Sequence, residues 1–269
     1  MIADADPELH PIVSLRGVWK SFDGRPVLRG LDLDVEPGRS LVVMGPSGCG
    51  KSVMLKHIVG LLRPDAGEVS FKGTRIDKLS ERHFAPIRRR IGFLFQSAAL
   101  FDSMTVRENV AFPLLETGQS GPDLEKRVLR TLDRVGLADS VDQMPSELSG
   151  GMRKRVGLAR AIVLEPEMIL YDEPTTGLDP IRANVINDLI VRLQRELNIT
   201  SVVVTHDLDS AFQVADRMVL LDEGRVRLDA TPDEMRHSED PVVRAFLEGR
   251  EFTPGEPTHE SLDPASMST

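Results

Sequence analysis

Short apolar stretches near the start of the chain predict β-strands. Apolar and polar residues alternate over residues 12–18 and again over 27–35, with the polar turn DGRP between them. Alternation is typical of a strand with one buried face, whereas the continuous run SLVVM at 40–44 is typical of a strand buried on both faces. The stretch 68–76 predicts a hairpin that turns at Lys72 and Gly73.

The middle of the chain has a helical spacing instead. A strand that we expect to end at Gln96 is followed by few β-branched runs up to residue 163. Segments such as DLEKRVLRTLDRVGL and GMRKRVGLARAIVL place apolar residues three and four positions apart, which is typical of a helix with one buried face. Residues 97–163 are therefore expected to form a helical subdomain inserted into an α/β core.

The last third of the chain alternates two kinds of segment. MILYDEP, TSVVVTH and a hairpin around Glu223 and Gly224 are typical of strands, and IRANVINDLIVRLQREL and DSAFQVADR are typical of helices. Such alternation predicts a largely parallel sheet in one α/β domain, which we place at 12–248. Residues 249–269 are rich in Pro, Ser, Thr and acidic residues, so this tail is expected to be disordered alone or to pack on a partner subunit.

Composition argues against several classes of protein. The net charge of −9 disfavours a protein that grips nucleic acid through its phosphates, so no nucleic-acid partner is expected. No apolar run is longer than four residues, and the N-terminus lacks the pattern of a signal peptide, so any membrane attachment is expected to go through a partner. The single cysteine, Cys49, is interpreted as a small loop residue in a reducing compartment.

A glycine-rich loop directly follows the continuous apolar strand. Gly45, Gly50, Lys51 and Ser52 match G-x-x-x-x-G-K-[ST], and a helix-like segment comes next. Glycines let backbone N–H groups approach phosphates, the lysine reaches the β- and γ-phosphate oxygens, and the hydroxyl binds Mg²⁺. We therefore expect ATP to bind here. The remaining contacts are expected from Pro46, Ser47, Gly48, Cys49 and Val53.

Two acidic residues, Asp172 and Glu173, end the apolar run MILY. Nucleotide hydrolysis needs a carboxylate linked to Mg²⁺ and a group that deprotonates the attacking water. Asp172 is suited to the first role and Glu173 to the second. Acidic residues also end strands for purely structural reasons, and position alone does not separate the two interpretations.

A second candidate anion site lies at Ser149, Gly150 and Gly151, which open the helical segment MRKRVGLARA. The N-terminus of a helix favours negative charge, because its first backbone N–H groups point outward without partners. The alternative is that Ser149 only caps the helix.

Taken in order, these motifs resemble the ABC transporter ATPase family. LSGGM, then an apolar strand ending in Asp-Glu-Pro, then TTGLDP and TSVVVTHD carry the resemblance, which covers about residues 12–248. It implies an α/β P-loop NTPase fold of ABC type, with a RecA-like core, an N-terminal antiparallel β-subdomain and the inserted helical subdomain. It also implies a head-to-tail dimer, in which Ser149, Gly150 and Gly151 of one subunit contact the γ-phosphate bound by the other.

The resemblance assigns catalytic roles to further residues. Gln96 matches the glutamine that senses Mg²⁺ and water, and His206 matches the switch histidine at the γ-phosphate. Together with Ser52 and Asp172, Gln96 completes the implied Mg²⁺ site. With Lys51 and the base Glu173, these residues form the implied centre for hydrolysis.

Three other positions bear on the resemblance. Asp179 matches the aspartate of the D-loop at the subunit interface, and Phe22 resembles the aromatic residue that stacks on adenine, where the family often has tyrosine. Met152 departs from the family pattern, which usually has glutamine there. This departure removes no implied phosphate contact, because Ser149 and backbone N–H groups supply those contacts.

Three stretches are similar to the ATPases of MCE-domain lipid transporters, the group that contains the bacterial Mla phospholipid system. They are LFQSAALFDSMTVRENVAFPL (94–114), PSELSGGMRKRVGLARA (145–161) and DPVVRAFLEG (240–249). The similarity implies two copies of this chain with an integral membrane permease and MCE-domain lipid-binding proteins, at the cytoplasmic face of the bacterial inner membrane. It leaves open whether a small regulatory subunit also binds. Residues 98–114 are expected to form the groove that receives a permease helix.

Three alternative functions stay open at this point. In the first, the same kind of ATPase subunit works with another permease and moves a small polar solute. A soluble ABC-type ATPase in DNA repair or translation would be expected to have tandem cassettes, coiled-coil insertions or basic surfaces, whereas this sequence has one glycine-rich loop, no heptad insertion and an acidic pI near 5.3. A nucleotide sensor without hydrolysis would lack Glu173 or His206, and both are present.

Overall fold

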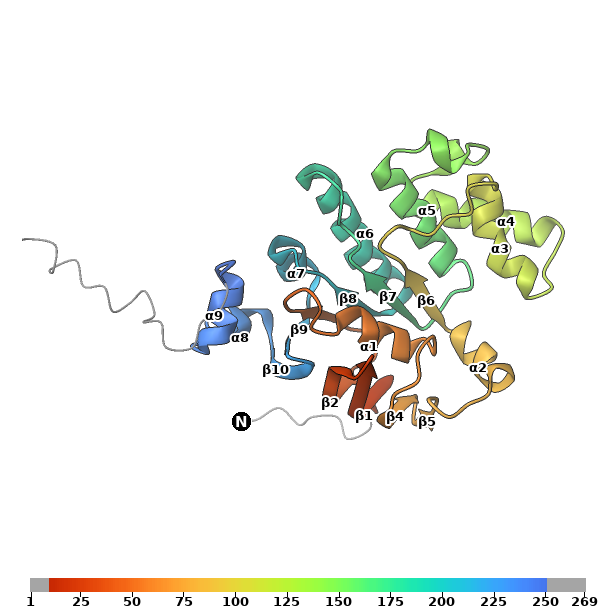
Figure 1. Ribbon diagram of the computed structural model, residues 1–269. Helices are drawn as coiled ribbons and strands as arrows, with labels where there is room; N and C mark the ends of the chain where they lie inside the picture. The colour runs from red at the N-terminus through yellow and green to blue at the C-terminus, as the bar shows by residue number, and fades with distance from the viewer. Residues whose placement is uncertain (1–9, 251–269) are drawn as a thin grey trace, which may run out of the picture.

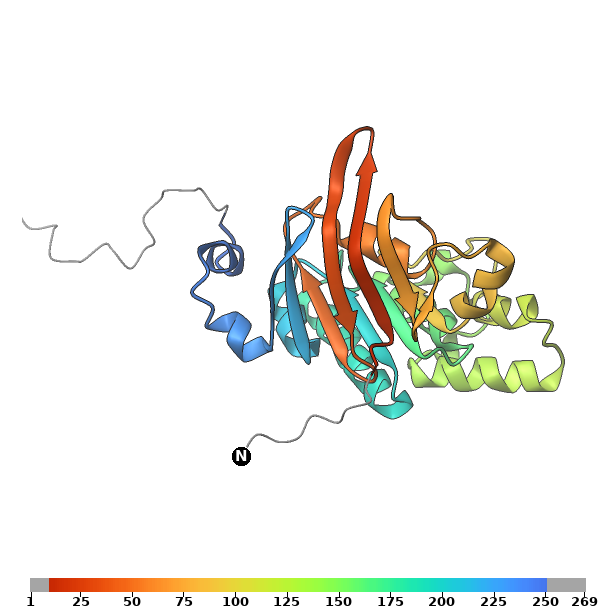
Figure 2. The same cartoon turned by 90° about the horizontal axis from the view of Figure 1, so that it is seen from below.

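Two β-sheets organise residues 10–250, which the computed structural model describes (Figure 1). One is an antiparallel sheet of four strands in the order β2-β1-β4-β5. Figure 2 shows its two longest strands side by side. The expected hairpin turn is present at Lys72 and Gly73, which both have positive φ. The strands are β1 (Val13–Phe22), β2 (Arg25–Val35), β4 (Ala66–Phe71) and β5 (Thr74–Arg75).

The other sheet has six strands in the order β10-β9-β3-β8-β7-β6. All neighbouring strands are parallel except β10, which forms the expected hairpin with β9. The carboxyl ends of the parallel strands therefore meet at one edge, where α/β proteins bind ligands. The strands are β3 (Ser40–Met44), β6 (Ile91–Leu94), β7 (Met168–Asp172), β8 (Thr200–Val204), β9 (Arg217–Asp222) and β10 (Arg225–Ala230).

Strand β3 is buried on both faces, as its continuous apolar run predicts. Val42 and Met44 belong to the core that contains residues of helices α5 (Gly150–Ile162) and α6 (Pro180–Leu197). Leu41 and Val43 belong to the core shared with the antiparallel sheet and helix α1 (Lys51–Ile58). Because successive side chains of a strand point to opposite faces, this one strand joins both cores and holds the loop that follows it rigidly.

Helices α3 (Val106–Glu116), α4 (Pro122–Arg134) and α5 fall within the range expected for the helical subdomain. Figure 1 shows α3 and α4 at one end of the molecule, with α5 between them and the parallel sheet. Their buried faces share the core of α6, so no separate core isolates them. The division of the chain at 97 and 163 stays a prediction. Further helices are α7 (Leu208–Val214), α8 (Pro232–Arg236) and α9 (Pro241–Leu247).

The fold differs from the expectations at two places near residue 90. Helix α2 (Glu81–Arg88) was not predicted, because it contains Pro86, has several charged residues and buries only Phe84. Strand β6 ends at Leu94 rather than at Gln96. The chain leaves the sheet there and turns through Ala98 and Ala99, which both adopt left-handed backbone conformations.

None of the helices in residues 10–250 is both long and apolar enough to span a bilayer. The tail expected at 249–269 lies outside the described residues from position 251 onward. Its order and its contact with a partner subunit therefore stay predictions.

Candidate functional site

The glycine-rich loop connects β3 to α1 and needs glycine at two positions. A Cβ atom at Gly45, where φ is +148°, would lie 2.1 Å from the Leu221 carbonyl oxygen. A Cβ atom at Gly50, where φ is +109°, would lie 2.6 Å from a methyl carbon of Leu28. Only glycine fits such a conformation without displacing its neighbours. The loop therefore brings its backbone N–H groups to the start of α1, which favours an anion.

Lys51 is the first residue of α1, and its side chain lies along the loop. Its Nζ donates to the carbonyl oxygens of Gly45 at 2.7 Å and Pro46 at 2.9 Å. Burial raises the pKa of the Cys49 thiol, and the Lys51 charge opposes this change. Cys49 is buried in the loop. This fits its interpretation as a small loop residue.

The two carboxylates at the end of β7 have different partners. Ser52 Oγ donates to Asp172 Oδ1 at 2.8 Å, which joins α1 to β7. Burial raises the pKa of Asp172, and the hydrogen bond from Ser52 opposes this effect. Glu173 Oε2 accepts from Thr176 Oγ1 at 3.1 Å and lies 2.9 Å from His206 Nδ1.

The backbone of Glu173 is strained. Its φ is +52°, a conformation that non-glycine residues rarely adopt. Its N–H donates to the Val204 carbonyl at 2.9 Å, which fixes this conformation against the neighbouring strand β8. Strain of this kind often marks a functional position, because the surrounding structure must hold it in place.

Most of the loop and the predicted catalytic side chains line one pocket of about 320 Å³, whereas Gly45, Pro46 and Cys49 are not among its lining residues. Gln96, Glu173 and His206 come to it from the carboxyl ends of three different strands. Val27 of β2 also lines the pocket and was not predicted, because an apolar residue inside a strand pattern carries no chemical signal. Asp172 does not line the pocket, but it accepts a hydrogen bond from Ser52, which does. The full lining is Val27, Ser47, Gly48, Gly50, Lys51, Ser52, Val53, Gln96, Glu173 and His206.

The second candidate anion site lies outside this pocket. Ser149 is exposed at the start of α5, where its hydroxyl accepts from the Met152 N–H at 3.3 Å. Asp179 caps α6 in the same manner, accepting from the Arg182 N–H at 3.0 Å. A Cβ atom at Gly150 would lie 3.4 Å from Leu178, so the start of α5 and the D-loop are neighbours. Within one chain, these residues and Gly151 are not brought to the glycine-rich loop.

Phe22 also does not line the pocket. It ends β1 with 41% of its surface exposed, and Lys20 Nζ lies 5.5 Å from its ring centroid. The ring is therefore accessible to a flat ligand on the antiparallel sheet. Its predicted contact with adenine stays a prediction.

Comparison with known proteins identifies the family. A model of the ABC transporter family matches residues 28–176. The intermembrane phospholipid transport system ATP-binding protein MlaF of Haemophilus influenzae is 43% identical over 244 residues, which are 90% of this chain and 92% of that protein. The probable ribonucleotide transport ATP-binding protein mkl of Mycobacterium leprae is 41% identical over 243 residues, which are 90% of this chain and 70% of that protein.

A solved structure supports the same family. The dimeric ATP-binding cassette MJ0796, in a post-hydrolysis state with ADP and Pi bound, matches with a TM-score of 0.76 at 35% identity. The match covers 82% of this chain and 98% of that chain. The predicted fold class is confirmed: a P-loop α/β core with an antiparallel sheet and added helices. The chain belongs to the ABC transporter family, as an ATP-binding and ATP-hydrolysing subunit.

Proposed function

We propose that Glu173 is the general base for hydrolysis of ATP in the pocket around the glycine-rich loop. Its carboxylate lines that pocket together with Lys51. Glu173 takes a proton from the attacking water, whose oxygen bonds to the γ-phosphorus while the bond to the β–γ bridging oxygen breaks, leaving ADP and phosphate. Gln96 and His206 hold the water and the γ-phosphate, and Lys51 binds the phosphate oxygens. Phe22 stacks on the adenine from the end of β1.

Ser52, Gln96 and Asp172 are proposed to hold the Mg²⁺ that accompanies ATP. Ser52 and Asp172 are hydrogen bonded, and Ser52 and Gln96 line the same pocket. The described residues contain no cluster of three His, Cys, Asp or Glu side chains suited to a metal cage. A few oxygen donors fit Mg²⁺, which keeps several waters and shares the substrate phosphates. When bound, Mg²⁺ neutralises charge on the phosphate oxygens.

Two copies of the chain are proposed to close head to tail around ATP. The start of α5 suits an anion but lies outside the pocket of its own chain, which supports a role toward the ATP of a partner. The structural relative MJ0796 was solved as a dimer. Ser149, Gly150 and Gly151 of one copy contact the γ-phosphate held by the other, with Asp179 at the interface. ATP closes this pair, and hydrolysis with phosphate release reopens it.

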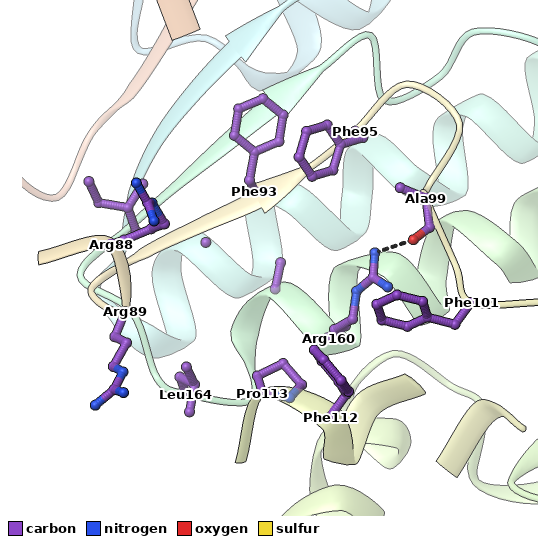
Figure 3. A pocket seen from close by; sticks show the side chains of 13 residues that line it. Arg88, Arg89, Phe93, Phe95, Ala99, Phe101, Phe112, Pro113, Arg160 and Leu164 are labelled. Atoms are coloured by element: carbon purple, nitrogen blue, oxygen red, sulfur yellow. Dashed lines mark hydrogen bonds between the residues drawn. The ribbon is translucent and has the colours of Figure 1, made fainter. Parts of the chain in front are cut away.

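A membrane permease is proposed to dock in a groove of about 480 Å³ beside the segment that follows Gln96. Figure 3 shows Phe101 and Phe112 on one side of this groove and Phe93 and Phe95 on another, with Arg160 directed to the Ala99 carbonyl. The predicted segment 98–114 supplies only part of the lining. Helices α2 and α5, strand β6 and residues directly beside them supply the rest, namely Arg88, Arg89, Ile91, Gly92, Phe93, Phe95, Arg160, Ala161 and Leu164.

Replacing Phe101 by aspartate is expected to reduce recovery of the permease at least about tenfold, because the change removes an exposed aromatic ring from the contact and puts a hydrated carboxylate in its place. ATP affinity should stay within about twofold of wild type, because Phe101 does not line the ATP pocket. Leu129→Asp is the matched control, since Leu129 on α4 is 40% exposed and Phe101 is 41% exposed. Co-purification from membranes checks both variants. Equal recovery with the two variants would contradict docking in this groove.

Phospholipid is the proposed cargo, moved between bacterial membranes together with an MCE-domain protein and a small regulatory subunit. The observation that carries this proposal is the 43% identity to MlaF of Haemophilus influenzae along 92% of that protein. The chain would then sit peripherally at the cytoplasmic face of the inner membrane. A second candidate, transport of a ribonucleotide, is favoured by the similarity to mkl, a probable ribonucleotide transport ATP-binding protein of which the match covers 70%.

Purification of the tagged chain from membranes in mild detergent tests the cargo. Mass spectrometry of the purified complex is expected to identify a permease, an MCE-domain protein and bound phospholipid. A permease with a solute-binding protein and no phospholipid would overturn the cargo and leave the ATPase in place. Retention of a ribonucleotide other than ATP or ADP, in place of lipid, would favour the second candidate.

A further inference from the structure

Lys154 is a buried cation on α5 with two unusual partners. Its ammonium donates to the backbone carbonyl oxygens of Gln96 and of Glu173, the second at 3.0 Å. Only 5% of the residue is exposed. The two carbonyls belong to residues whose side chains line the ATP pocket from different strands. One side chain therefore joins the two segments that supply the proposed base and the proposed water-binding glutamine.

Lys154 also joins both segments to the start of α5. It lies four residues after Gly150, so the two residues share a face of the helix. Ser149 caps the helix one turn before Lys154. A displacement of this turn would therefore move the ammonium relative to both carbonyls, because a helix moves as a nearly rigid element over such a distance.

The rest of α5 is in close contact with the segment that follows Gln96. A Cβ atom at Gly157 would lie 3.1 Å from the Ala98 Cβ, so glycine permits this close approach. Arg160 donates to the carbonyl oxygens of Ala98 at 2.9 Å and Ala99 at 2.8 Å, the two residues with left-handed backbones. Lys154 is thus one end of a continuous contact between α5 and this segment, and it is the end that reaches the pocket.

The charge of Lys154 suits this position. Burial lowers the pKa of its ammonium, and the nearby carboxylates of Glu173 and Asp172 oppose that change. An ammonium provides three N–H donors without any acceptor, so it can serve two carbonyls at once. Hydrogen bonds from a charged donor are stronger than those between neutral groups, which favours a well-defined distance between the two segments.

We propose that Lys154 is a positioning residue for ATP hydrolysis, which holds the backbones of Gln96 and Glu173 at a fixed separation and ties both to the start of α5. This inference rests on the proposed roles of Glu173 and Gln96. It predicts that Lys154 affects the chemical step much more than ATP binding, because Lys154 itself does not line the pocket.

The experiment compares Lys154→Met, Lys154→Arg and Arg155→Met in the full-length chain purified with its membrane partners. Methionine has a side chain of similar length to lysine but no hydrogen-bond donor. Arginine restores the donors at position 154. Arginine can serve two carbonyls at once, because Arg155 and Arg160 on the same helix each donate to two carbonyls from one nitrogen. Arg155 is a matched control, because it is a partly buried cation on α5 whose carbonyl partners, Val135 and Gly136, lie outside the pocket.

Lys154→Met is expected to lower kcat by about 10- to 100-fold with KM for ATP within about threefold of wild type. Lys154→Arg should recover kcat to within about fivefold, because the guanidinium restores a positive charge and N–H donors. Arg155→Met should leave both constants within about twofold, with any loss confined to the melting temperature. Melting temperatures and equilibrium ATP binding are measured on all variants, so that kcat is expressed per folded, nucleotide-binding molecule.

Two outcomes would overturn the inference. The first is a Lys154→Met variant whose kcat per nucleotide-binding molecule equals that of wild type, whatever its melting temperature. The second is an equal loss of kcat in Lys154→Met and Arg155→Met, because the effect would then be general to α5. Glu173→Gln is measured in parallel. Undiminished hydrolysis by that variant would overturn the proposed base and this inference with it, whereas its inactivity beside a normal Lys154→Met would overturn the inference alone.

Discussion

Replacing Glu173 by glutamine is expected to lower kcat for ATP hydrolysis by at least about 100-fold, because the amide cannot accept the proton of the attacking water. ATP affinity should stay within about threefold of wild type, since the amide has nearly the same shape as the carboxylate. The hydrogen bond from Thr176 and the contact with His206 can both be kept by the amide. Steady-state ATPase activity and equilibrium nucleotide binding check the two parts of this prediction.

The same variant should accumulate the closed dimer. Hydrolysis reopens the proposed dimer, so a protein that binds ATP without hydrolysing it is expected to remain dimeric at ATP concentrations where wild type returns to monomer. Size-exclusion chromatography with ATP and Mg²⁺ measures this directly.

Glu165→Gln is the matched control, because Glu165 also has a left-handed backbone, at φ +55°, but forms exposed ion pairs with Arg127 and Arg130. The control should hydrolyse ATP within about twofold of wild type. Undiminished ATP turnover in the Glu173→Gln variant would show that Glu173 is not the general base.

The sequence places Gln96, Glu173 and His206 beside one another for a physical reason, while their roles stay predictions. Gln96, Glu173 and His206 each follow an apolar strand by a residue or two, and parallel strands bring such positions to one edge. The residue type in the glycine-rich loop is constrained more strongly than the strand positions, because a Cβ atom at Gly45 or Gly50 would clash with its neighbours. Strand pattern and local chemistry thus specify both the place and the conformation.

Features that depend on packing between distant segments were less predictable. Helix α2 contains Pro86 and buries only Phe84, so its sequence carries little sign of a helix that packs on the core. The groove combines residues of α2, β6, α3 and α5, and only the α3 side and the preceding loop were expected. Lys154 appears in the sequence as one of several basic residues on a helix. Its burial against two carbonyls follows only from the way α5 lies against the segments that follow β6 and β7.

Ser149→Asp is expected to weaken ATP-driven dimerisation by on the order of 100-fold, because it places a carboxylate beside the γ-phosphate held by the partner. Folding should be unaffected, since aspartate caps a helix as well as serine does and Ser149 is exposed. Ser149→Asn is the matched control, because asparagine has the shape and capping ability of aspartate without its charge. ATP binding to the single chain should be normal in both variants, because Ser149 does not line its own pocket.

Mixing variants separates action across the dimer from action within one chain. Lys51→Met removes the ammonium from the glycine-rich loop, so neither this variant nor Ser149→Asp should hydrolyse ATP alone. In a mixed head-to-tail dimer, one site combines both defects and the other combines an intact loop with an intact Ser149. When the membrane permease pairs the two chains at random, half of the complexes are mixed and half of the sites in those are complete, so an equal mixture should recover about a quarter of wild-type activity. If Ser149 acted on the ATP of its own chain, every site in the mixture would carry a defect, and no activity would return.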